Sequence, residues 1–155
     1  MQNTQEHRLL CQQRNKEFLA LYHPTLDALL EKGMKPSDAR RAAAEFTIAN
    51  GHPRYHVEHE RAYRCVCHLL TAGEKNSNNA RDFADHEIDL SQTRLRRQMW
   101  QEITDRVRSL QQQGMSVNCA IDHVLEYCRA SRFFITVNTA LTKICPQARE
   151  RALRR

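Results

Sequence analysis

Two stretches of this sequence, RYHVEHERAYRCVC at Arg54–Cys67 and RFFITVNTALTKIC at Arg132–Cys145, place the same kinds of residue in the same order. Each begins with Arg and an aromatic residue, continues with Val or Ile two positions later, and ends on Cys. A pattern that recurs in this way indicates an internal duplication, and the repeated unit then decides the architecture. The matched small and aliphatic positions are Ala62 with Ala140 and Val66 with Ile144.

A second correspondence lies upstream, where a shift of 81 residues aligns two amphipathic patterns that stop at the same dipeptide, Gly33-Met34 and Gly114-Met115. The apolar residues recur at spacings of three and four, which is the stripe of a helix that buries one face. Gly directly after such a run is typical of a helix end, because Gly adopts the left-handed conformation without strain. The aligned stripes are Phe18, Leu19, Tyr22, Leu26 and Leu29, and Met99, Trp100, Ile103, Val107 and Leu110.

Two further helices are expected after each of these glycines. Pro36 suits the first turn of a middle helix in one copy, and Ser116 is a good N-cap in the other. An extended connector from the shared Arg to the Val or Ile then leads to a last helix. Thr136 is its expected N-cap in the second copy, and Glu58 takes that place, less favourably, in the first.

The fold class predicted from these patterns is all-α, with two tandem three-helix repeats that resemble a helix-turn-helix. Gly and Pro are scarce, at 4 each, as expected for a helical chain. We expect the first repeat at residues 1–73, a polar linker at 74–90, and the second repeat with a basic tail at 91–155. Pro24 should kink or break the first long helix, since it lacks a backbone donor.

Several classes of protein are disfavoured by the composition. The chain has no apolar run long enough to span a membrane and no apolar stretch typical of a signal peptide, so we expect a cytoplasmic protein whose six Cys are thiols. Cys65, Cys67 and His68 do not have the paired spacing of a zinc site, and we predict no metal or other cofactor. A Cys119–His123 pair is the best catalytic geometry, but no nucleophile or phosphate-loop motif accompanies it, so we predict no enzyme activity.

The net charge of +6 and the pI of about 9.2 favour an anionic partner. From residue 89 on, Lys and Arg are twice as numerous as Asp and Glu. The predicted function is nucleic-acid binding, to DNA rather than RNA, by a regulatory protein of the kind that bacteria, mobile elements and phages encode. The predicted nucleic-acid-binding residues are Arg54, Arg61, Arg64, Arg94, Arg96, Arg97, Arg132, Asn138, Thr139, Lys143, Arg149, Arg151, Arg154 and Arg155.

Two alternatives stay open at this point. Arg54 and Arg132 can hold a phosphate beside the last helix, or can serve the fold by pairing with an acid or stacking on an aromatic ring. The whole chain can instead be a non-catalytic module for protein–protein interaction, assembly or self-association. Aromatic residues are typical anchors of such interfaces. The candidates are Trp100, Tyr55 and the adjacent Phe133 and Phe134, of which only one of the last two can enter its own core.

Overall fold

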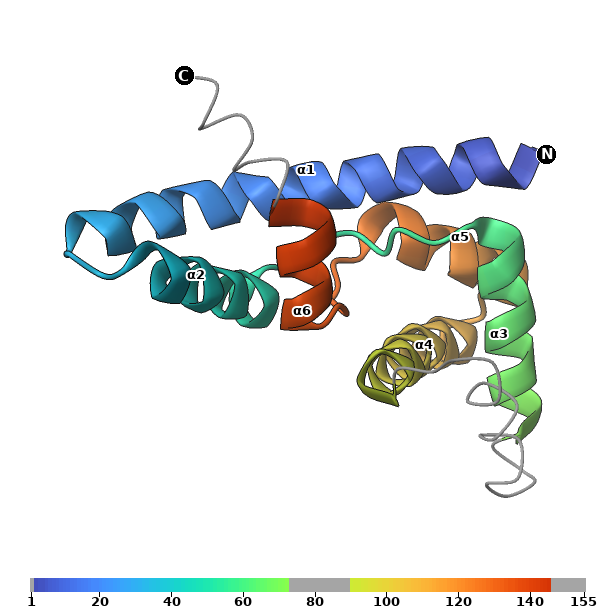
Figure 1. The fold of residues 1–155 in the computed structure, drawn as a ribbon. Helices are drawn as coiled ribbons and strands as arrows, with labels where there is room; N and C mark the ends of the chain where they lie inside the picture. Colours follow the sequence, from blue (N-terminus) through green and yellow to red (C-terminus); the bar gives the residue numbers. More distant parts are fainter. Residues whose placement is uncertain (1, 73–89, 146–155) are drawn as a thin grey trace. The chain divides into compact units, whose positions relative to one another are not determined.

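The computed structural model describes residues 2–72 and 90–145, and within them the regular structure is helical throughout, without a strand (Figure 1). The predicted all-α class is therefore confirmed. The helices are α1 (Gln2–Glu31), α2 (Pro36–Asn50), α3 (His59–Ala72), α4 (Leu90–Gln112), α5 (Val117–Tyr127) and α6 (Val137–Thr139), and α6 continues into a π-helical segment, η2 (Ala140–Ile144).

The two long helices end at the predicted glycines and in the same way. Gly33 and Gly114 have φ angles of 89° and 97°, which only Gly adopts freely. After α1, the amide of Met34 donates to the carbonyl of Leu29 at 3.3 Å. After α4, the amide of Met115 donates to the carbonyl of Leu110 at 3.1 Å. These bonds satisfy carbonyls at the helix end, so the local sequence alone determines both stops.

The other predicted helix signals also hold, with one exception. The hydroxyls of Ser116 and Thr136 accept hydrogen bonds from the amides of Cys119 at 3.3 Å and Thr139 at 3.1 Å, so both residues are N-caps. Pro24 was predicted to kink or break the first long helix, and the break is wrong, because α1 continues past it to Glu31. Pro24 lies on an exposed face of α1, where water can solvate the carbonyl that lost its donor.

The chain forms two compact units, each built from both halves of the sequence. One unit comprises Met1–Leu10 and Arg54–Ala130, and the other comprises Cys11–Pro53 and Ser131–Arg155. We call them the α3–α4–α5 unit and the α1–α2–α6 unit. This division differs from the predicted repeat boundaries, because each last helix packs on the long and middle helices of the other half.

The core of the α1–α2–α6 unit shows this exchange. Phe18 and Tyr22 of α1 pack against the C-terminal segment, whose Phe133, Ile144 and Cys145 are almost completely buried. The rings of Phe18 and Phe133 meet edge to face, with centroids 5.2 Å apart. Figure 1 shows α6 beside α2, which supplies the remaining wall of this core. The residues from α2 are Ala43, Ala44 and Ile48.

The α3–α4–α5 unit is assembled in the corresponding way. Helix α3 packs on both α4 and α5, and α4 packs on α5. Ala62 and Val66 of α3 are fully buried, and the connector before α3 buries Tyr55. A helix that reaches the long and middle helices of the other half thus completes each unit. The buried apolar residues of α4 and α5 are Trp100, Ile103, Val107, Ala120, Ile121 and Val124.

Candidate nucleic-acid interface

Arginines from the two halves of the sequence come together in the α3–α4–α5 unit. Arg61 and Arg64 are exposed on α3, and Arg96 is half-buried on the neighbouring helix α4. Arg96 is more than thirty positions from Arg61 and Arg64 in the sequence, and the packing of α3 against α4 brings its helix beside theirs. We call Arg61, Arg64 and Arg96 the arginine cluster.

Arg61 also influences the titration of Arg96 and of the neighbouring Cys65. The pKa of the Arg96 guanidinium is lowered, first by its partial burial and then by the positive charge of Arg61. Burial raises the pKa of the Cys65 thiol, while the charges of Arg61 and Arg64 partly oppose this change. Arg stays protonated at neutral pH, so Arg61 and Arg96 are like charges on neighbouring helices.

The other predicted basic residues fall into three groups. Arg94 and Arg97 are exposed on α4, and Arg54 is exposed in the connector before α3, all within the same unit as the arginine cluster. Arg132 is half-buried and donates to the carbonyl of Phe133 at 3.1 Å, a local contact that fits the structural role better than the phosphate-binding role. The predicted basic tail lies outside the described residues, with Arg149, Arg151, Arg154 and Arg155.

The predicted base-reading residues lie on α6 and η2. Asn138 and Lys143 are exposed there, while Thr139 is half-buried and its hydroxyl accepts from that of Thr136 at 2.8 Å. Thr139 is therefore less available to a ligand than Asn138 or Lys143. The segment belongs to the α1–α2–α6 unit, so these residues and the arginine cluster belong to different units.

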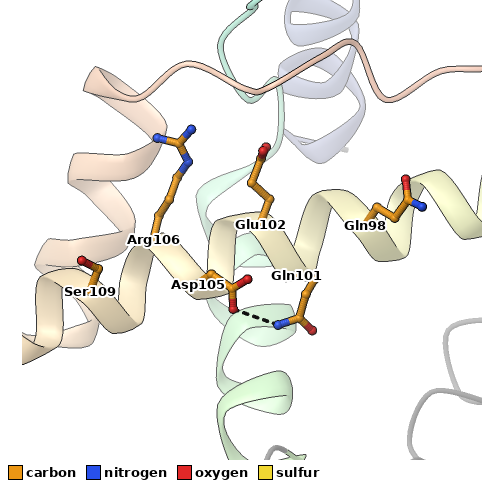
Figure 2. Close-up of a pocket in the computed structure, with 6 residues that line it drawn as sticks. All are labelled: Gln98, Gln101, Glu102, Asp105, Arg106 and Ser109. Carbon is orange, nitrogen blue, oxygen red and sulfur yellow. Dashed lines mark hydrogen bonds between the residues drawn. The ribbon is translucent and has the colours of Figure 1, made fainter. Parts of the chain in front are cut away.

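A shallow groove of about 520 Å³ runs along α4 in the α3–α4–α5 unit (Figure 2). Its lining includes Glu102, Asp105 and Arg106, and Asp105 accepts a hydrogen bond from the side chain of Gln101 at 3.0 Å. Two carboxylates against one guanidinium make this surface unfavourable for phosphate. The groove therefore does not extend the arginine cluster. Its other lining residues are Gln98 and Ser109.

The same face of α4 anchors the connector that leads to α3. The hydroxyl of Tyr55 donates to Glu102 at 2.6 Å, and the guanidinium of Arg106 lies 5.9 Å above the Tyr55 ring. Arg106 also donates to the carbonyl of Arg129 at 2.9 Å. Burial, followed by the hydrogen bond to Glu102, raises the pKa of Tyr55 well above its usual value. Glu102 and Arg106 thus serve the fold of this unit.

The aromatic residues proposed as interface anchors are mostly core residues, so that expectation is wrong. Trp100, Tyr55 and Phe133 are at most 4% exposed, while Phe134 is half-buried, as the alternation along an extended connector requires. Sequence analysis missed exposed aromatics. Phe46 in α2, Tyr63 in α3 and Tyr127 at the end of α5 are 47%, 41% and 72% exposed. Phe46 and Tyr127 lie at equivalent places of the two patterns aligned by the 81-residue shift, which is the signal that could have identified them.

Few other groups of side chains among the described residues could bind a metal ion or take part in catalysis. All six Cys are free, and among residues 2–72 and 90–145 no three His, Cys, Asp or Glu are grouped so that they could hold a metal ion. Cys119 is exposed, and the ring of His123 lies 5.1 Å from that of Tyr127. His59 Nε2 and Asp122 Oδ1, 2.7 Å apart, link α3 to α5. No helix in the described part of the chain is long and apolar enough to cross a membrane.

Comparisons with known proteins add no constraint. No protein-family model, curated protein or solved structure matches this chain.

Proposed function

We propose that this protein is a non-catalytic, cytoplasmic nucleic-acid-binding protein, and that the arginine cluster on α3 and α4 is its main contact with the phosphate backbone. One observation carries the proposal: the packing of α3 on α4 brings together two helices from distant parts of the sequence that carry Arg61 and Arg96, and the charge of Arg61 contributes to the lowered pKa of Arg96. A phosphate bound between such side chains would gain two charge-assisted contacts. Arg64, Arg94 and Arg97 would extend the same contact.

The proposal includes a duplicated helix-turn-helix-like architecture in which the last helices are exchanged. The support is the sequence correspondence and the matching ends of α1 and α4 at Gly33 and Gly114. The helix that would lie against nucleic acid in the arginine-rich unit is then α3, packed on α5 rather than on the middle helix that precedes it. DNA is the preferred ligand class, because a helix with exposed Arg side chains fits a major groove.

The test is fluorescence anisotropy of the purified protein with a generic DNA duplex at several salt concentrations. The informative variant is Arg61→Gln with Arg96→Gln, and Arg8→Gln with Arg41→Gln is its control, since it removes the same charge from exposed positions on α1 and α2. We expect salt-sensitive binding in which the first double variant lowers the slope against salt by about 2, while the control changes it little.

Three results would contradict the proposal: no binding at micromolar protein, binding that does not depend on salt, or equal losses in the two double variants. A further variant measures how much the C-terminal tail contributes to DNA binding. It combines Arg149→Ala, Arg151→Ala, Arg154→Ala and Arg155→Ala. A loss confined to that variant would move the site from α3 and α4 to the tail.

A protein-interaction module is the second candidate, and Phe46 and Tyr127 are the observation that favours it. Both are large, exposed and at matched positions of the two middle helices. Aromatic side chains at such positions are typical interface anchors. A Phe46→Ser, Tyr127→Ser variant that binds DNA normally but no longer forms oligomers in light scattering would support this second function.

A further inference from the structure

We propose that the two halves of this chain are each other's binding partners: a protein severed between them remains a tight one-to-one complex held by the two exchanged last helices. The halves are residues 2–72 and 90–145 of the described chain. The inference does not depend on nucleic-acid binding. It follows from the composition of the two compact units, each of which lacks a wall of its core if only one half is present.

On α1 and α2, the first half presents a site that fits the connector and last helix of the second half. Phe133 enters this site with its ring against Phe18, and its amide donates to the carbonyl of Ile48 at 3.1 Å. A Cβ on Gly51 would overlap the Phe133 ring, so a residue without a side chain forms part of the site. The site is therefore matched in shape to one aromatic residue.

The rest of this interface is apolar, and its innermost residues are buried. Ala140 and Ile144 have no exposed surface, and Cys145 has 1%. The removal of these apolar side chains from water stabilises the contact. Withdrawal of the segment would expose these residues together with Phe18 and Tyr22.

The second half presents the reciprocal site on α4 and α5, and this one is partly polar. Ala62 and Val66 of α3 are fully buried against it. Tyr55 adds its hydrogen bond to Glu102, and His59 pairs with Asp122 of α5. Breaking this contact would leave the Glu102 carboxylate and the Arg106 guanidinium without the phenol that lies between them.

The two contacts reinforce each other because the same pair of fragments makes both. After one last helix leaves, the other still holds the fragments together, so that rebinding is intramolecular. Such bivalence raises an affinity by about 10²–10⁴ over either contact alone. We therefore expect the severed protein to stay associated at micromolar concentration or below.

The experiment uses the full chain with a protease recognition sequence inserted between Asn78 and Asn79. The intact protein is purified and cleaved, and the product is run on gel filtration with mass detection at 1 µM, roughly the concentration at which a moderately tight complex persists. The expected result is one species with the mass of both fragments and an unchanged circular dichroism spectrum, which separates only in denaturant. Fragments that elute apart under native conditions would overturn the proposal.

Two variants of the cleavable chain test the contacts one at a time. Phe133→Ala should weaken fragment association by about 100-fold or more, and Tyr55→Phe by about tenfold or more. Phe134→Ala, at the half-buried neighbouring position, is the control and should change the affinity little. If Phe133→Ala does not fold even before cleavage, Tyr55→Phe and its control still decide the question. Unchanged affinity in both Phe133→Ala and Tyr55→Phe would overturn the proposal.

Discussion

The two connectors of this protein occupy matched places in the sequence and are held by different physical means. In the α3–α4–α5 unit, Tyr55 is anchored by its hydroxyl on Glu102 and by the Arg106 guanidinium above its ring. In the α1–α2–α6 unit, the Phe133 ring packs against Phe18 and against Gly51, which has no side chain that would overlap the ring. One connector is thus held by a hydrogen bond and a cation–π contact, and the other by close packing of its aromatic ring. The comparison teaches that two connectors with similar sequence patterns can be held in place by different interactions.

The largest expected effect comes from filling the space above Gly51. A Gly51→Val substitution would place a Cβ in steric overlap with the edge of the Phe133 ring and 2.8 Å from the Thr47 carbonyl oxygen. Because the clash is with a buried ring and with backbone, we expect a loss of about 3 kcal/mol or more in the free energy of unfolding. Urea denaturation measures it. Ala49→Ser, at an exposed neighbouring position, is the control, and an equal stability of the two variants would contradict the packing account.

Exchanging the two aromatic residues should cost stability in both units. Phe133→Tyr places a hydroxyl in an apolar core, which costs about 1–3 kcal/mol. Tyr55→Phe removes one hydrogen bond to a charged acceptor, which costs about 1.5–3 kcal/mol. Thermal and urea unfolding check both values. If Phe133→Tyr is neutral while Tyr55→Phe destabilises, the α1–α2–α6 unit must offer a polar partner that the comparison does not include.

Alkaline pH should weaken both units through their buried tyrosines. Burial, with a further contribution from Cys145, raises the pKa of Tyr22 to about 12, and burial with the Glu102 bond raises that of Tyr55. A phenol whose pKa is raised by folding stabilises the fold fully below its unfolded pKa of about 10, and this stabilisation is lost as the pH rises through the folded pKa.

We therefore expect the free energy of unfolding to decrease from about pH 10 upward. The half-buried thiol of Cys65 and the buried thiol of Cys145, whose pKa values are also raised by partial or full burial, add a loss of the same sign that begins at lower pH. Tyr55→Phe should flatten the curve above pH 10, whereas Tyr127→Phe, which alters an exposed side chain, should not. Equal pH curves for Tyr55→Phe and the wild type would contradict the assignment.

The smallest effect concerns two buried threonines, one in each unit. The hydroxyl of Thr47 donates to the carbonyl of Ala43 at 2.8 Å, whereas that of Thr104 is fully buried without a hydrogen-bond partner. Thr104→Val should stabilise the protein by about 0.5–1 kcal/mol, because an unsatisfied polar group leaves the core. Thr47→Val should be neutral or destabilising. The order of the two melting temperatures tests the difference, and a reversed order would contradict it.

The sequence was sufficient for features that depend on near neighbours. The ends of the long helices at Gly33 and Gly114, and the caps at Ser116 and Thr136, depend on residues within one helical turn and were predicted correctly. The alternation at Phe133 and Phe134 also held, because an extended chain must point adjacent side chains to opposite sides. The compact units could not be predicted. Periodicity shows which face of a helix is buried, but not which of two similar surfaces covers it.

The same ambiguity explains what was missed at the candidate interface. The last helices carry interchangeable apolar patterns, Ala62 and Val66 in one and Ala140 and Ile144 in the other. Only the exchange brings Arg61 beside Arg96, so the sequence could name both residues without showing that they meet. Trp100 was misjudged as a candidate surface anchor although it lies on the apolar stripe of α4, where burial is the expected outcome.

The exchange of the last helices is the central claim, and proton NMR tests it most directly. The account predicts a nuclear Overhauser effect between the rings of Phe18 and Phe133, whose centroids lie 5.2 Å apart. If each last segment packed within its own half instead, Phe133 would meet Met99, the counterpart of Phe18. The variants Phe18→Leu and Met99→Leu assign the signals. A cross-peak from Phe133 to Phe18 supports the exchange, and one to the Met99 methyl group, with none to Phe18, would contradict it.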